Sequence, residues 1–552
     1  MKEKDRIIKS FFVIFLSIIL STCAPRKKVE LQPLQLEEFQ NKTEAADRLF
    51  KTGSYTCLKE SYQIYQELLS IPHNQKSTKR KLIKTAILLS IRQRELGVHD
   101  STYLDEASEL IQNNPFLSGL MTFVDLADSI RPRSKGMMGD IIDDSRRADE
   151  RRDRLEENME KWGQELKETS VTEEFFAYLY IAKNCRLAYS IKGKKVIGEE
   201  VDLTHFRSIF PQSPLIQYKL ALCPKEDSES LNELLAEEPR FHEIHYFLGE
   251  HALQQKRLIS AEKNFLECFK HIPESLPTVI SLASIYFAFE ELDKSLNFYD
   301  KAIALVPEYR DALVGKAICL SYLERHDEAI EVCNEILRLG GYYLGDTHYW
   351  LAWNQNELER LDEAWENVEK CKTYFIGYTQ VFSLAGVIAY KKEEKKVAEK
   401  NLQEALRLDP NNCEAAFYLG KIYAERPEWA KSGEYYEKAA LCQRGKELSL
   451  ERNLAEIEDS AFSEERKQKK IAKKKAQLKK TILTKATFFY NAAAGYFNAG
   501  MNEQALELAE QALSHSALKE KAEELIQEIK KRKQAPITPP VCQRSNGVRP
   551  RH

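Results

Sequence analysis

The residues best suited to metal chemistry stand together at His242, Glu243 and His245, with His251 two turns further along. Histidines three residues apart lie on one face of a helix and could share a metal ion. Zinc, however, takes three or four ligands in a tetrahedron, and the remaining ligands cannot be recognised in the sequence. We therefore expect no metal at this segment.

Sequence patterns of other catalytic sites are absent. The chain has no Gly-rich phosphate loop, no Cys-x-x-Cys, no His-Glu-x-x-His and no Gly-x-Ser-x-Gly. We expect no enzymatic activity and no cofactor. A catalytic domain hidden in residues 116–240 stays an alternative hypothesis, which would require an acid/base or metal constellation in the folded protein.

The 11 cysteines show no tight spacing of the kind that indicates a disulfide framework. Cys268, Cys333 and Cys371 fall at positions that we expect to face a helical core, where cysteine behaves as a small hydrophobic residue. We expect buried free thiols there. The redox state of the other cysteines stays open.

A regular spacing of small residues indicates which elements carry these side chains. One series steps by 34, 34, 35, 34 and 34 residues through Gly249, Ala283, Ala317, Ala352, Gly386 and Gly420. A second series follows twelve positions after each member of the first, at Ala261, Ser295, Ala329, Ala364, Ala398 and Ser432. A period near 34 is the signature of a stacked array of helical hairpins.

Helical periodicity supports the same architecture. In residues 276–309, Leu282 and Tyr286 share one helical face, and Leu296, Tyr299 and Ile303 share another. One hairpin cannot bury such faces alone, so neighbouring hairpins must stack into a continuous core. The sequence therefore predicts an all-α fold, an α-solenoid of stacked antiparallel helix pairs with an irregular helical N-terminal region.

The small residues, together with Pro273, Pro307 and Pro410 at the ends of three units, resemble the tetratricopeptide (TPR) repeat family over residues 242–446 and, less fully, over 486–519. The resemblance implies a scaffold that binds other proteins through the first helix of each hairpin. Carried onto this chain, the binding positions of the family become Tyr246, Phe287, Tyr322, Tyr349, Trp353, Asn356, Tyr390 and Phe417. This aromatic set fits an extended peptide or the helix of a partner protein.

The N-terminus predicts export. A charged segment precedes the apolar run 11–20, which is typical of a secretory signal. Residues 20–23 resemble the lipobox of bacterial lipoproteins, which implies cleavage before Cys23 and acylation of that residue. Thr22 departs from the usual Gly, Ala or Ser, so an uncleaved N-terminal anchor stays an alternative. Either form tethers the protein to a membrane outside the cytoplasm.

Two charged segments interrupt the regular array. Residues 140–168 predict a long charged helix, either a coiled-coil partner face or a helix that packs on 172–190. Residues 466–485 predict a basic helix with a thin apolar line. It could lie on an anionic membrane, hold an acidic partner or simply present lysines to solvent.

These patterns divide the chain into eight predicted segments. They are a signal peptide (1–22), a flexible tether (23–36), a degenerate TPR-like region (37–132), a long charged helix with a helical connector (133–239), a TPR array of about six repeats (240–446), a degenerate hairpin with the basic helix (447–485), a C-terminal TPR-like unit with a capping helix (486–530) and a disordered basic tail (531–552).

Together the features predict a lipid-anchored interaction scaffold of the bacterial cell envelope. The alternative is a solute- or lipid-binding accessory protein of an envelope transport system, which a closed apolar cavity would favour. A formal net charge of -3 gives no reason to expect a nucleic-acid partner. The oligomeric state stays open.

Overall fold

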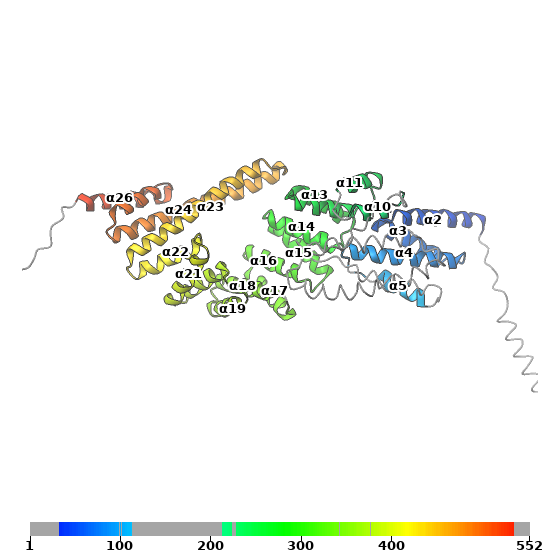
Figure 1. Ribbon diagram of the computed structural model, residues 1–552, viewed down its shortest axis with the longest axis horizontal. Helices are drawn as coiled ribbons and strands as arrows, with labels where there is room; N and C mark the ends of the chain where they lie inside the picture. Colours follow the sequence, from blue (N-terminus) through cyan, green and yellow to red (C-terminus); the bar gives the residue numbers. More distant parts are fainter. Residues whose placement is uncertain are drawn as a thin grey trace, which may run out of the picture. The chain divides into compact units, whose positions relative to one another are not determined.

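The computed structural model describes residues 32–112 except 99 and 101, and residues 212–534 except 223–227, 342 and 376. Every regular element in this part of the chain is an α-helix, drawn in Figure 1 from α2 in blue to α26 in red. Within the same residues, no helix is long and apolar enough to cross a bilayer. The predicted all-α solenoid of helix pairs is confirmed.

The structure forms two units, residues 1–282 and 283–552, which we describe separately and call unit 1 and unit 2. Unit 1 contains α2 (Pro33–Thr52), α3 (Tyr55–Leu69), α4 (Gln75–Glu95), α5 (Thr102–Gln112), α10 (Pro214–Ala221), α11 (Ser228–Glu237), α12 (Ile244–Gln254) and α13 (Leu258–His271). The boundary falls inside α14 (Leu276–Ala288). Unit 2 continues with α15 (Leu292–Leu305), α16 (Arg310–Tyr322), α17 (His326–Leu339), α18 (Leu344–Glu357), α19 (Leu361–Tyr374), α20 (Thr379–Lys391), α21 (Lys395–Leu408), α22 (Cys413–Glu425), α23 (Trp429–Glu458), α24 (Glu464–Asn498), α25 (Asn502–Ala512) and α26 (Ser516–Gln534).

Several predicted segments lie outside the described residues. They include the signal peptide with Cys23, the charged helix over 140–168 and most of the basic tail. The predicted tether over 23–36 differs from the structure at its end, because α2 already begins at Pro33. Proline suits the first turn of a helix, where its missing N–H would have no partner within the helix.

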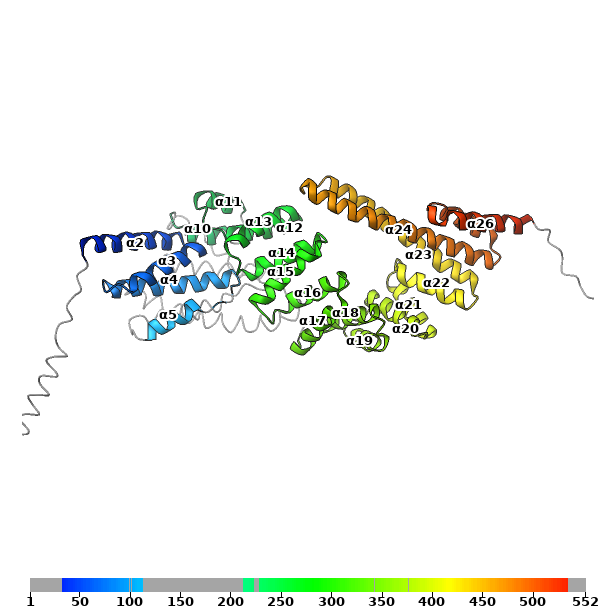
Figure 2. The same cartoon turned by 180° about the vertical axis from the view of Figure 1, so that it is seen from behind.

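Successive helices of unit 2 pack as hairpins, and each hairpin packs on the next. Within hairpins α16 contacts α17, α18 contacts α19 and α20 contacts α21, while α17, α19 and α21 each also contact the following first helix. Figure 2 shows the same succession from behind. We call α14, α16, α18, α20 and α22 the first helices, and their partners the second helices.

The two series of small residues mark the places where the two helices of a hairpin cross. The hydroxyl of Ser295 donates to the carbonyl oxygen of Ala283 at 2.8 Å, and the hydroxyl of Ser432 donates to that of Gly420 at 2.9 Å. At Gly420 an added Cβ would lie 2.9 Å from the ring of Tyr436. At this twelve-residue offset the two small residues meet where the helices of a hairpin cross.

Each turn from a first to a second helix uses the same backbone geometry. The turn residues Glu290, Glu324, Glu359 and Glu393 all have positive φ angles, between 55° and 63°. The next residue donates its N–H five positions back, as Arg325 does to Leu320 at 2.9 Å. This is the Schellman ending of a helix, which satisfies carbonyls that would otherwise have no partner.

The segment predicted as a separate degenerate hairpin over 447–485 differs in the structure. It is the distal half of α23 followed by the proximal half of α24, two helices of 30 and 35 residues that contact each other. The end of α24 then pairs with α25, and Ala493 and Ala505 again lie twelve residues apart and fully buried. The repeat therefore resumes after a projecting pair of helices, residues 441–485, which we call the arm.

Unit 1 is organised around a buried ion-pair network. Arg92 on α4 is fully buried, pairs with Glu95 and Glu243, and places its guanidinium 4.4 Å from the ring centroid of Tyr218 on α10. Glu243 also accepts the backbone N–H of Tyr55 at 3.0 Å. A buried charge is tolerated only when it is paired. The network therefore fixes how α3, α4 and α10 pack against the segment that leads into α12.

We expect two glycine substitutions in unit 2 to have opposite effects. Gly420→Ala should lower the free energy of unfolding by about 1 kcal/mol or more, because the new methyl group meets the Tyr436 ring. Gly445→Ala should raise it by about 0.5–1 kcal/mol, because that helical glycine has no atom within 4 Å of an added Cβ. Urea unfolding measures both. A neutral or stabilising Gly420→Ala would contradict the close crossing.

Candidate functional site

The histidine and glutamate residues of 242–245 have structural contacts in unit 1. His242 stacks on His271 with ring centroids 3.5 Å apart, and the Nδ1 of His245 lies 3.2 Å from the amide oxygen of Asn264. Glu243 is fully buried in the network around Arg92. Among the described residues, no group of three His, Cys, Asp or Glu side chains is arranged to hold a metal ion.

The free cysteines of the described part of the chain are buried. Cys268, Cys333 and Cys371 are buried free thiols, as the sequence predicted. Burial raises the pKa of Cys268 and of Cys333 to about 12, so little thiolate forms at neutral pH. Cys413 at the start of α22 forms a disulfide with Cys442 on α23, which the sequence did not predict.

The surface most suited to binding is a succession of aromatic rings along the first helices of unit 2. Phe287 on α14 lies 6.0 Å from Tyr322 on α16, and Tyr322 lies 5.6 Å from Trp350 on α18. Trp350 in turn contacts Tyr349 at 5.4 Å and Trp353 at 5.8 Å. We call these five residues the aromatic row. Its members come from three successive hairpins, so the repeat itself brings them together.

A second aromatic group lies further along the array. Tyr390 on α20 contacts Tyr418 on α22 at 5.2 Å, and Phe417 stacks on Phe488 of α24 at 4.9 Å. The ammonium group of Lys421 lies 4.7 Å from the Tyr390 centroid, and it lies within 5.7 Å of the ring centroids of Phe417 and Tyr418 on α22. Cation–π attraction of this kind holds a positive charge against the rings.

The aromatic row keeps part of its surface available to a partner. The side chain of Tyr322 is 55% exposed, an unusual value for a ring with two aromatic neighbours. Phe287, Tyr349, Trp350 and Trp353 are half-buried. Burial raises the pKa of Tyr349 above its ordinary value, so its phenol stays protonated and can donate a hydrogen bond.

The predicted binding residues are divided by the structure. Phe287, Tyr322, Tyr349 and Trp353 meet in the aromatic row, while Tyr390 and Phe417 belong to the second group. Asn356 is only 3% exposed and its amide donates to Glu357, so it offers little surface. Tyr246 lies in unit 1 against Phe247 and Phe265. Their role in binding stays a prediction.

Sequence reasoning missed Trp350, Tyr418 and Lys421. Each immediately follows a residue that it named, or lies one turn beyond one, on the same first helix. The resemblance supplied only fixed positions within the repeat, whereas ring contacts depend on how far each side chain reaches. An aromatic pair in sequence, such as Tyr349 with Trp350, was the available signal.

The comparisons with known proteins agree with the architecture. The family model described as tetratricopeptide repeat matches residues 280–343 and 384–446. These two stretches contain α15–α17 and α21–α22 together with parts of the adjoining helices. No curated protein matches the sequence.

Solved structures resemble part of the chain. A crystal structure of MamA protein is 17% identical and covers 31% of this chain and 94% of its own, with a TM-score of 0.29. YrrB, described as a TPR protein with an unusual peptide-binding site, is 23% identical over 34% of this chain and 97% of its own, with a TM-score of 0.28. A tetratricopeptide repeat protein from Parabacteroides merdae is 14% identical over 49% and 99%, with a TM-score of 0.34. Likeness at this level carries no argument about function.

The stacked histidines predict an acid-sensitive unit 1. Burial, followed by the neighbouring His271 and His245, lowers the pKa of His242 from 6.5 to about 4. Between these pH values the unfolded chain binds more protons than the folded chain, so stability should fall as the pH drops from about 6.5 to about 4. Urea unfolding at several pH values measures this slope. His242→Gln should flatten it, whereas His251→Gln leaves the stack intact and should not. Identical slopes in both variants would contradict the assignment.

Proposed function

The chain carries tetratricopeptide repeats, and we propose that it is a non-catalytic scaffold of the bacterial cell envelope that binds a protein partner along the aromatic row. TPR arrays build extended binding surfaces by stacking hairpins. The observation that carries the proposal is the run of contacting rings from Phe287 to Trp353, with Tyr322 largely exposed.

The chemistry of the row favours an extended peptide or a helix with apolar side chains. Tyrosine and tryptophan rings offer large contact areas at a small cost in conformational entropy. A phenol hydroxyl next to apolar rings can also bond to the backbone of a peptide, which fixes its register. Interfaces with this composition concentrate their binding energy in a few aromatic side chains.

The disulfide supports an exported location. Cys413 and Cys442 join α22 to α23 in the array, and such bonds persist mainly in oxidising compartments. This agrees with the secretory signal and with the lipid anchor proposed at Cys23. A lipid anchor there would leave the repeats in an aqueous compartment, where an aromatic surface can meet its partner.

The partner should be identified by cross-linking the native, membrane-extracted protein and analysing captured molecules by mass spectrometry. A reproducible envelope protein cross-linked to first helices of unit 2 would support the scaffold. A bound lipid or small solute without a protein partner would favour the alternative, an accessory protein of an envelope transport system.

Removing rings from the aromatic row should weaken the captured complex. We expect Tyr322→Ala combined with Trp353→Ala to lower partner affinity at least about 30-fold, the loss of one or more binding hot spots. Trp365→Ala is the control, because it removes an equally large, half-buried ring from the second helix α19. Calorimetric titration measures affinity, and thermal melting measures stability. Equal affinity losses in both variants would contradict a binding role for the row.

A second variant tests the anchor. Cys23→Ala should shift the protein from the membrane fraction to the aqueous fraction, because acylation needs the cysteine sulfur. Fractionation followed by immunoblotting measures the shift, with Cys57→Ala as a cysteine control in the folded region. Unchanged membrane association of Cys23→Ala would indicate an uncleaved N-terminal anchor instead.

A further inference from the structure

The arm has no core of its own. No described residue between Ala440 and Ala486 is buried, although both of its helices continue directly from the packed array. Near its base Lys485 forms an ion pair with Glu447. Helices in proteins are stabilised mostly by packing of an apolar face, so a pair with no buried side chain needs support from elsewhere.

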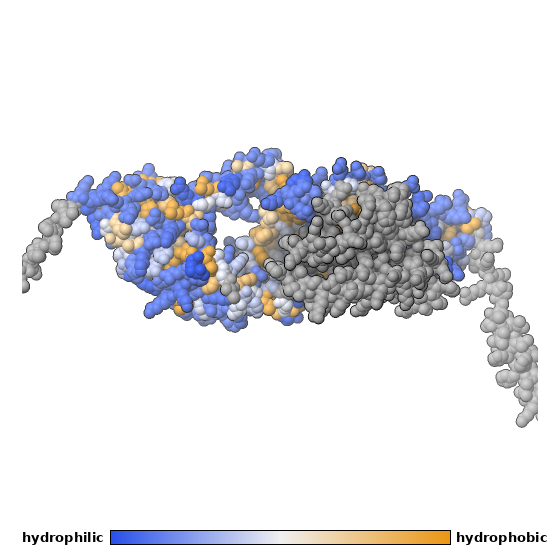
Figure 3. All heavy atoms as spheres, in the orientation of Figure 1, coloured by the Kyte–Doolittle hydropathy of each residue, from blue (hydrophilic) through white to orange (hydrophobic). Residues whose placement is uncertain are grey.

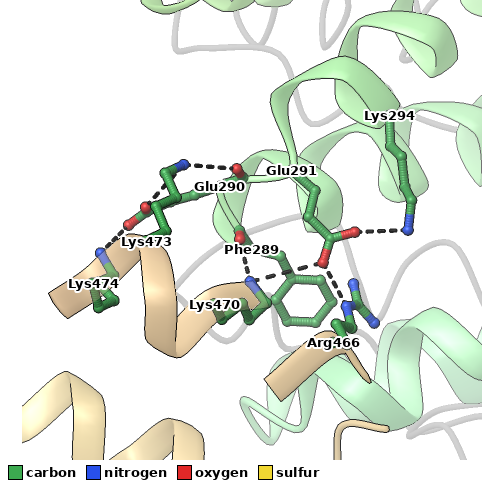
Figure 4. Close-up of polar contacts among 8 residues, drawn as sticks. All are labelled: Phe289, Glu290, Glu291, Lys294, Arg466, Lys470, Lys473 and Lys474. Carbon is green, nitrogen blue, oxygen red and sulfur yellow. Dashed lines mark hydrogen bonds and ion pairs between the residues drawn. The ribbon is translucent and has the colours of Figure 1, made fainter. Parts of the chain in front are cut away.

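That support comes from a contact at the distal end of the arm, shown in Figure 4. Arg466, in the first turn of α24, places its guanidinium 4.5 Å from the ring of Phe289 and 4.7 Å from that of Phe462. The two phenylalanine rings meet edge to face at 5.0 Å. Phe289 belongs to the turn between α14 and α15, far from the arm in sequence.

Four basic residues of α24 hold the two carboxylates of this turn. Glu291 pairs with Arg466 and lies 3.8 Å from the ammonium group of Lys470, while Glu290 pairs with Lys474 and lies 3.4 Å from that of Lys473. We call this set of contacts, from Phe289 to Glu291 on one side and from Phe462 to Lys474 on the other, the latch.

The backbone of the turn takes part as well. The ammonium group of Lys470 donates to the backbone carbonyl oxygen of Phe289. Lys473 donates to the carbonyl of Glu290 at 3.2 Å. Burial alone would raise the pKa of Glu290, but the ammonium groups of Lys474 and Lys473 outweigh it and lower that pKa below its ordinary value. The carboxylate is therefore charged at neutral pH.

The latch closes unit 2 on itself. Contacts run continuously from α15 through α16, α17 and the following helices to α23 and α24, and the start of α24 returns to the turn before α15. Figure 3 shows the opening that remains between the arm and the stacked hairpins. A solenoid normally leaves both of its ends apart, so this closure depends on the latch rather than on the repeat.

The contacts of the latch are of a kind that salt weakens. Glu290 is 42% exposed and Lys473 47% exposed, so water and ions reach the pair. Exposed ion pairs add little stability, and screening shortens their range to about 8 Å at physiological ionic strength. Arg466, Lys470 and Lys474 are less exposed, with 14–19% of each side chain open to solvent, and Arg466 packs on the buried ring of Phe289. No residue of the arm itself is buried, so we expect the closed form to be favoured only modestly over the open form.

We propose that the latch is sensitive to salt. When it is formed, the arm closes unit 2 into a ring, and when it breaks, α24 separates from the turn at 289–291. In the closed form the arm helices are held at both ends. In the open form they are held only at the base, where Lys485 and Glu447 meet.

The residues of an equivalent turn elsewhere in the chain can replace the two glutamates of the latch, which tests the latch without disturbing the fold. The equivalent turn of the preceding hairpin reads Lys256-Arg257, and Lys256 adopts the same positive φ as Glu290. Glu290→Lys with Glu291→Arg, a double variant that we call the reversed latch, therefore suits the turn but opposes the basic residues of α24. The matched control is Glu393→Lys with Glu394→Arg, because that turn also carries two glutamates and its φ of 63° is similar. No contact between that turn and α24 is found among the described residues.

Hydrogen exchange of the arm amides in the full chain is the measurement. We expect exchange over 441–485 to be at least tenfold faster in the reversed latch than in the wild type, and unchanged in the control. Raising NaCl from about 0.05 to about 0.5 M should accelerate the wild-type arm and leave the reversed latch as it is. As a charge-swap rescue, Glu290→Lys alone should also speed arm exchange, and adding Lys473→Glu and Lys474→Glu to it should restore protection, because Glu291 keeps its contacts with Arg466 and Lys470. Equal arm exchange in wild type and reversed latch, with both folded, would overturn the proposal.

The latch also bears on partner binding, a consequence that rests on the proposed function. A ring that closes after a partner has reached the first helices should slow its release. With the cross-linked partner, dissociation from the reversed latch should be about tenfold faster than from the control variant. Equal dissociation, combined with faster arm exchange, would leave the latch in place and remove its role in retention. Failure of the aromatic-row variant to weaken binding would instead overturn the proposed function.

Discussion

The close crossing of two helices at small residues is the constraint on which this structure depends. The hydroxyl of Ser295 can donate to the carbonyl of Ala283 because both side chains are small enough to let the two helices approach closely. The same crossing recurs at Ser432 and Gly420. In these two hairpins a serine hydroxyl joins the second helix to a backbone carbonyl of the first, and in the others alanine at the same position keeps the crossing close. The two helices of a hairpin therefore have little freedom in their relative position, and similar hairpins stack in the same way.

That constraint also decides where the large side chains lie. Small residues occupy the crossings, so bulky residues such as Tyr299 and Tyr436 fill the spaces beside them; an added Cβ at Gly315 would collide with the ring of Tyr299. First-helix aromatic residues that do not face a crossing are left half-buried, and in three successive hairpins they form the aromatic row. The binding surface is thus what remains after the core is packed. Its composition, and not the fold, sets which partner can bind.

The sequence was informative wherever a contact recurs with the repeat. The series through Ala283 and Ser295 predicted the hairpins, and the position of Cys333 within its hairpin predicted a buried thiol. Contacts that occur only once in the structure leave no repeating pattern in the sequence, so they could not be predicted from it. Glu243 stands in the segment whose residue types suit a metal site, but in the structure its carboxylate pairs with Arg92, 151 residues away in the sequence. Cys413 and Cys442 are 29 residues apart, a spacing with no characteristic meaning, and only the packing of α22 on α23 brings them together.

The two kinds of contact differ in what they require of the chain. The crossing joins residues 12 apart, so the loop that it closes is short and its contacts form together with the helices. The latch joins Phe289 to Lys470 across 181 residues, and it can form only after every intervening hairpin is in place. It buries no residue of the arm in return. The repeat can therefore remain folded whether or not the arm is docked, and the arm can respond to charge in its surroundings without endangering the array. This separation of a stable array from a weakly held closure is what lets a rigid solenoid contain a movable part.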